Sequence, residues 1–104
     1  MLTVTIAGYT FNGPYSSTGS IKDKSGVYAV LCKKDNKYFV VDVGESSTPK
    51  SRLDKHDRKG CWKRECTNGT IHYAIKYTPN LQQAGRMKVE QDIRAKINVP
   101  CGKT

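Results

Sequence analysis

Acidic residues are scarce in this chain of 104 residues, in which 9 Asp and Glu stand against 18 Lys and Arg and the formal net charge is +9. A positive charge of this size on a short chain favours an anionic partner, and nucleic acid is the foremost of these. The alternative is a charge that serves solubility alone.

Long apolar runs are also missing, so no segment reaches the length that spans a bilayer and we expect no membrane partner. The N-terminal sequence MLTVTIAGYTF alternates apolar and polar residues and lacks the basic lead and apolar run of a signal peptide. These two absences together predict a cytoplasmic protein.

No C-x-x-C pair occurs among the four cysteines, which is evidence against a zinc site. Because cytosolic reductants keep most disulfides open, we expect all four to be free thiols. A zinc site is the less favoured alternative, and its ligands would come from five residues: His56, Cys61, Cys66, His72 and Cys101.

The length predicts one domain over residues 1–104, large enough to bury a modest core without disulfides or metal. Residues 1–25 read as an N-terminal extension in which Leu2–Ile6 forms an edge strand. Gly13 and Pro14 then mark a turn into a loop.

A hairpin is predicted between Gly26 and Val43, with strands over about 27–32 and 38–43 joined by the polar connection KKDNK. Centring the connection on Asp35 places Tyr28 opposite Asp42 on the neighbouring strand.

The stretch from Val40 to His56 contains the end of the second predicted strand and two candidate site residues. A helix is expected over about 49–58, and i, i+4 spacing would place Arg52 and His56 on one face, a pair suited to phosphate. Residues 60–69 read as a loop that holds Trp62, for which we favour a packing role over base stacking.

Residues 70–77 alternate like a third sheet strand with His72 on its polar side, and residues 81–97 read as the last helix. Glu90 falls inside the apolar stripe of that helix, where a carboxylate needs a cation or a metal. A structural pair with Arg86 or Arg94 and a functional role are equally open. The order of elements predicts an α+β fold in which a small antiparallel sheet is flanked by helices.

An ordered set of residues resembles the GIY-YIG nuclease family over residues 26 to about 101. Gly26-Val27-Tyr28 stands for the first motif and Asp42-Val43-Gly44 for a divergent second one. Arg52 lies eight residues after Gly44, His56 four residues later, and Glu90 in the last helix.

The resemblance implies the family's fold and a metal-dependent endonuclease that hydrolyses phosphodiester bonds. It implies that Tyr28 activates the hydrolytic water or acts as nucleophile, that Arg52 contacts the scissile phosphate and that His56 helps in proton transfer. Glu90 would bind one Mg²⁺ or Mn²⁺ ion, held mainly by water and substrate phosphate.

The chain departs from the family's pattern at two places. Asp42 replaces the tyrosine of the second motif, where it would bind the metal, serve as an alternative base or repel the DNA phosphate. The family's late asparagine is absent, since Cys101 and Gly102 follow Pro100 and Asn98 comes too early.

Three functions remain as hypotheses: a DNA endonuclease, a nucleic-acid-binding module that has lost cleavage, and a protein-interaction domain. For the first two we expect DNA rather than RNA, low sequence specificity or a protein partner that supplies it. The nucleic acid would contact seven basic residues around the site: Lys50, Arg52, Lys55, Arg58, Lys59, Lys63 and Arg64.

Overall fold

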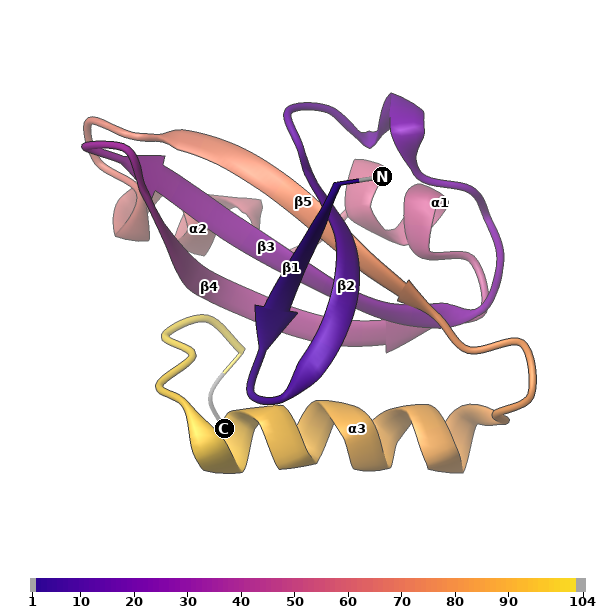
Figure 1. Cartoon of the computed structure of the whole chain (residues 1–104). Helices are drawn as coiled ribbons and strands as arrows, with labels where there is room; N and C mark the ends of the chain where they lie inside the picture. Colours follow the sequence, from indigo (N-terminus) through magenta and orange to yellow (C-terminus); the bar gives the residue numbers. More distant parts are fainter. Residues whose placement is uncertain (1, 103–104) are drawn as a thin grey trace.

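In the computed structural model, which describes residues 2–102, five antiparallel strands form one sheet in the order β1-β2-β5-β3-β4 (Figure 1). The strands are β1 (Thr3–Ile6), β2 (Tyr9–Tyr15), β3 (Gly26–Lys34), β4 (Lys37–Ser46) and β5 (Thr70–Tyr77). The helices are η1 (Thr18–Ser20, a 3₁₀ turn), α1 (Pro49–Asp54), α2 (Lys59–Glu65) and α3 (Gln83–Lys96). The predicted mixed fold, an antiparallel sheet with helices, is confirmed.

Alternation along β3 divides the core between two faces of the sheet. Tyr28, Val30 and Cys32 pack in one cluster with Leu53 of α1 and Trp62 of α2. The intervening β3 residues pack in a second cluster with Ile93 of α3, which the N-terminal hairpin also joins: Val27, Ala29, Leu31, Ile6 and Phe11. We call the first the α1/α2 face and the second the α3 face.

The predicted loop after Leu2–Ile6 is wrong, because residues 9–15 form β2 and pair with both β1 and β5. Ala7 and Gly8 make the turn, each with positive φ (52° and 89°), in the two-residue geometry that matches the twist of a hairpin. Gly13 and Pro14 lie inside β2 instead of ending the segment.

The predicted pairing of Tyr28 with Asp42 is also wrong: Tyr28 lies opposite Gly44, and Asp42 opposite Val30. One position of this shift comes from the turn, which centres on the Asp35–Asn36 pair, both with positive φ. The other comes from a break in register between Val30 and Leu31, where β4 accommodates one extra residue.

The helix expected over 49–58 ends early, at Asp54, and His56 lies beyond its C-terminus. Part of the expected loop 60–69 is helical instead, since α2 runs from Lys59 to Glu65 and includes Gly60. Trp62 in α2 is buried, which agrees with the packing role we favoured.

All four cysteines are paired, so the expectation of free thiols is wrong. Cys32–Cys66 joins the end of β3 to the residue after α2, and Cys61–Cys101 joins α2 to the C-terminal segment. The pairing leaves no cysteine thiolate for the zinc site considered above. Disulfides persist chiefly in oxidising compartments, which is evidence against the expected cytoplasmic setting.

Within residues 2–102 we find no helix with both the length and the apolar character that crossing a bilayer would require.

Candidate active site

Tyr28 lies at the centre of the candidate site, on β3 in the middle of the sheet, and only 1% of its surface is exposed. Its ring covers Gly44 on the neighbouring strand so closely that a Cβ at position 44 would overlap the hydroxyl oxygen and the ring. Only glycine can therefore sit beneath the ring. The Tyr28 hydroxyl lies 2.7 Å from His56 Nε2.

The backbone of Arg58 fixes the tautomer of His56. Its N–H donates to His56 Nδ1 at 3.0 Å, so Nδ1 carries no proton in the neutral ring. Burial lowers the pKa of His56 to about 4, with further lowering by the charges of Arg52 and Arg58. At neutral pH the ring is therefore uncharged, carries its proton on Nε2 and donates that proton to the Tyr28 oxygen.

Burial raises the pKa of Tyr28 to about 12, and the charge of Arg52 opposes this rise. Asp42 and Glu90 raise the pKa further, while Arg58 lowers it. Tyr28 is consequently a phenol at neutral pH. The charges of these four residues act on the Tyr28 hydroxyl, and among the predicted catalytic residues His56 is the one that forms a hydrogen bond with it in the described part of the chain.

Arg52 reaches the site from α1 but is engaged by Asp57. Its guanidinium donates to Asp57 Oδ1 at 2.8 Å, and this bond lowers the pKa of the Asp57 carboxyl. The Asp57 side chain is 71% exposed, and ion pairs at the surface contribute little to stability. The pair is therefore weak and accessible to solvent.

Asp42 is held inside the protein by hydrogen bonds that engage both of its carboxylate oxygens. Its side chain is fully buried, and its oxygens accept hydrogen bonds from the Arg58 and Arg94 guanidiniums and the Trp62 indole at 2.8–3.2 Å. The Val43 N–H donates to it as well. Of the three roles considered, direct metal binding and service as an alternative base do not fit this environment, because two cations and two neutral donors already satisfy the carboxylate.

Glu90 lies at the rim of the α3 stripe, with its side chain 24% exposed. Of the two pairings considered from the sequence, the one with Arg94 is present, at 3.2 Å, whereas Arg86 pairs with Glu45. The bond from Arg94 uses only Oε2 of Glu90. Within residues 2–102 no donor bonds to Oε1.

The donor set for a metal is therefore small. No group of three His, Cys, Asp or Glu side chains in the described part of the chain gathers as a metal cluster. Glu90 Oε1 alone suits a hard cation such as Mg²⁺, which keeps several waters and binds through one or two carboxylates and phosphate oxygens.

The seven basic residues predicted to contact nucleic acid differ in availability. Arg58 is committed to Asp42, and Lys50 pairs with Asp54 at 3.0 Å. Four others have exposed side chains along α1, α2 and the turn between them: Lys55, Lys59, Lys63 and Arg64. Together with Arg52 they form what we call the basic rim.

Reasoning from the sequence missed the bond between Arg94 and Asp42, and it missed Asp57, which holds Arg52. Arg94 was visible as an i, i+4 partner of Glu90, but its bond to Asp42 connects residues 52 positions apart. The contact between Asp57 and Arg52 was not predicted because we expected the helix to continue beyond residue 54.

Together these observations define a small α+β domain with a buried tyrosine–histidine pair, an arginine in a solvent-accessible ion pair and a basic rim. Compared with known proteins, the chain matches no family model, no curated protein and no solved structure.

Proposed function

We propose that the protein is a metal-dependent endonuclease that hydrolyses phosphodiester bonds of DNA on a GIY-YIG-like scaffold. The observation that carries the proposal is the Tyr28 hydroxyl, seated on Gly44 and bonded to His56. The tyrosine of the first motif thus lies directly opposite the glycine of the second motif, on neighbouring strands of the sheet. A structural role for Tyr28 would account for the hydrogen bond to His56, because a buried hydroxyl needs a partner, but it would not require the arginines whose charges act on the hydroxyl.

In the proposed reaction, Arg52 exchanges Asp57 for the scissile phosphate and stabilises the charge that grows on its oxygens. The phenolate form of Tyr28 takes a proton from the attacking water, whose oxygen forms a bond to phosphorus. The bond from phosphorus to the leaving oxygen of the backbone breaks, and that oxygen takes a proton from solvent. The Nε2–H of His56 stabilises the phenolate, so the histidine acts as a hydrogen-bond donor and not as a proton acceptor.

Glu90 Oε1 is the protein atom that would hold the Mg²⁺ or Mn²⁺ ion, with water and phosphate oxygens as the other ligands. When bound, the ion supplies positive charge to the phosphoryl oxygens. Arg94 orients the carboxylate from its other oxygen.

A second candidate is a nucleic-acid-binding module that does not cut, and two observations favour it. The pKa of Tyr28, at about 12, leaves little phenolate at neutral pH. Asp42, in place of the motif tyrosine, contributes to the fold and not to the reacting centre.

The two disulfides lead us to propose an oxidising compartment for the protein in place of the cytoplasm.

A plasmid-nicking assay with and without Mg²⁺ or Mn²⁺ distinguishes the endonuclease from the binding module. We expect wild-type protein to nick only with metal, and Arg52→Ala and Tyr28→Phe to lower the rate by about 100-fold or more with modest loss of binding. Lys88→Ala, on the exposed side of α3, is the matched control and should nick normally.

Glu90→Gln keeps the shape of the side chain and removes the anionic ligand, so nicking should fall while the unfolding transition changes little. Nicking by this variant at the wild-type rate under saturating metal would sink the endonuclease proposal. Wild-type protein that binds DNA without cutting it would establish the binding module instead.

A further inference from the structure

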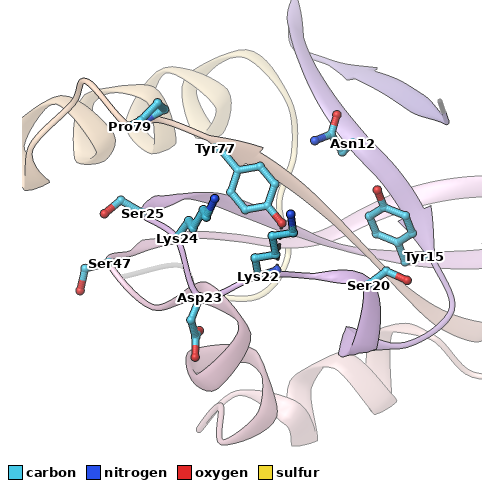
Figure 2. A pocket seen from close by; sticks show the side chains of 10 residues that line it. All are labelled: Asn12, Tyr15, Ser20, Lys22, Asp23, Lys24, Ser25, Ser47, Tyr77 and Pro79. Atoms are coloured by element: carbon cyan, nitrogen blue, oxygen red, sulfur yellow. Dashed lines mark hydrogen bonds between the residues drawn. The ribbon is translucent and has the colours of Figure 1, made fainter.

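A cavity of about 710 Å³ opens beside the candidate site, at the end of the sheet where β3 begins (Figure 2). Its lining includes two lysines, Lys22 and Lys24, and two tyrosines, Tyr15 of β2 and Tyr77 of β5. None of the residues assigned above to the active site lines it.

The cavity carries positive charge. Asp23 is the acidic residue of its lining, but both of its carboxylate oxygens accept hydrogen bonds from Ser51 at the start of α1. In Figure 2, Asp23 points toward that helix and away from the two ammonium groups. Neither Lys22 nor Lys24 forms an ion pair with a carboxylate of residues 2–102, so both charges remain available to an anion.

The wall of the cavity is fixed by three contacts before any ligand arrives. Ile21 is buried in the core of the α1/α2 face, and the backbone N–H of Lys22 donates to the Tyr77 hydroxyl at 2.9 Å. The bond between Asp23 and Ser51 ties the same loop to α1. A rigid cavity of this volume lies within the range of pockets that hold small ligands or single groups of a larger one.

Phosphate suits the lysines, and a base suits the tyrosine rings, because stacking on aromatic side chains accepts any base. The Asn12 amide and the hydroxyl of Ser25 can pair with base edges. A base that is stacked and paired inside a duplex cannot enter such a cavity. The chemistry of the cavity therefore suits an unpaired nucleotide.

The cavity is close enough to the active site to act on the same DNA strand. Ser25 in its lining precedes Tyr28 by three residues of extended chain, roughly 10 Å. A stacked strand carries one phosphate per about 3.4 Å, so the distance corresponds to about three nucleotides.

We propose that this cavity binds an unpaired nucleotide of the DNA substrate within about three nucleotides of the scissile phosphate, which makes the preferred substrate a flap, gap or single-stranded end. This inference rests on the proposed function, which names DNA as the substrate. A free mononucleotide shares the same chemistry, and the experiment separates the two sources.

Binding is measured by fluorescence anisotropy in EDTA, on a labelled duplex with a short single-stranded flap and on a continuous duplex of equal length. We expect wild-type protein to prefer the flap by about tenfold or more, and Lys22→Ala/Lys24→Ala to remove the preference. Both lysines are exposed, so their replacement should leave the fold intact. Lys88→Ala/Lys96→Ala removes the same charge from α3 and should retain the preference.

Tyr77→Leu removes the stacking ring and should weaken flap binding by about five- to hundredfold, whereas Tyr77→Phe keeps the ring, loses only the hydrogen bond from the Lys22 N–H and should weaken binding less. Excess deoxyadenosine monophosphate should compete only weakly with the flap if the strand delivers the nucleotide. Competition at equal concentrations would identify the free nucleotide as the ligand and overturn the proposal, as would equal binding of flap and duplex.

Cleavage of the same substrates separates this inference from the proposed function. A flap preference that depends on Lys22 and Lys24, without cleavage, supports the cavity and contradicts the endonuclease. Cleavage by wild-type protein, with a flap preference unchanged in the lysine variant, supports the endonuclease and overturns the cavity assignment.

Discussion

At the scale of single residues, the packing of the Tyr28 ring over Gly44 sets the position of the Tyr28 hydroxyl. Gly44 has no side chain, and the tyrosine ring occupies the space that one would fill. The motif glycine is therefore explained by packing and not by backbone freedom, since its φ lies outside the left-handed region.

Gly44→Ala should displace the Tyr28 ring, break its bond to His56 and destabilise the protein by about 1–3 kcal/mol, as overpacking of a core usually does. Urea unfolding measures the loss. Gly60→Ala is the matched control, because a Cβ there would lie 3.6 Å from the nearest neighbouring atom, and it should be neutral or slightly stabilising. Equal stability of Gly44→Ala and wild type would mean that the ring does not cover Gly44.

The buried neutral imidazole should make stability depend on pH between about 6.5 and 4. Because the pKa of His56 falls to about 4 on folding, the unfolded chain binds more protons in this window and stability falls as the pH is lowered through it. The loss is at most about 3 kcal/mol, from 1.36 kcal/mol per pKa unit.

Urea unfolding at several pH values, on wild type and on His56→Gln, checks this expectation. The glutamine can still accept from Arg58 and donate to Tyr28, but it does not titrate, so its curve should be flatter above pH 4. The carboxyls of Asp23, Asp54, Asp57 and Asp92 have lowered pKa values, and the stability that they contribute should be lost only at lower pH. Parallel curves for the two proteins would contradict the assignment.

Residue types in the site were predictable from spacing, but their contacts were not. Tyr28, Arg52 and His56 stand out in the sequence, and the fold gathers them. Asp42, by contrast, looked like a member of the reacting centre, because the sequence does not reveal that Arg58 and Trp62 from one segment and Arg94 from another converge on it.

At the scale of elements, the strands and helices with clear periodicity were predictable, namely β3, β4, β5 and α3. The sequence analysis missed β2 and α2. β2 follows a turn at Ala7 and Gly8 and pairs with β5, which is distant in sequence. α2 contains a glycine, a residue that is typical of loops.

α2 has only seven residues, too few to be stable alone, and the two disulfides attach it to β3 and to the C-terminal segment. Loop closure over 34 and 40 residues predicts a stabilisation of about 3–4 kcal/mol by each bond.

Replacing Cys61 and Cys101 by serine should therefore lower the free energy of unfolding by roughly that amount, and it should also loosen the segment whose Cys101 carbonyl accepts from Arg94. Urea unfolding gives the first effect, and hydrogen exchange of the Arg94 region the second. Cys32→Ser/Cys66→Ser is the control, with a similar loss of stability and less exchange near Arg94. A serine pair as stable as wild type would show that the bond does not form.

At the scale of the whole molecule, Tyr28, the basic rim and the tyrosines of the cavity, Tyr15 and Tyr77, lie on the α1/α2 face of the sheet. The α3 face holds a separate apolar core, and Glu90 reaches the candidate site from α3. Most of the features expected to bind DNA therefore lie on one side of the protein.

Binding to duplex DNA should weaken steeply with salt, because each neutralised phosphate adds about 0.9 to the slope of log affinity against log salt. Lys63→Ala/Arg64→Ala removes two charges of the basic rim and should reduce the slope by about 1.8. Titrations between 50 and 200 mM salt measure it, with Lys88→Ala on α3 as the control. An affinity that stays flat over this range would favour the protein-interaction domain instead.

The overlap of the two disulfide loops has one more consequence. The first bond encloses residues 32–66 and the second encloses residues 61–101, so every peptide bond between Cys32 and Cys101 lies inside at least one ring. A protease that cuts this region once, even in the lysine-rich turn between α1 and α2, leaves both fragments covalently attached. The basic residues that would attract DNA are also the sites that trypsin-like enzymes prefer, and the crosslinks let the molecule survive such a nick in one piece.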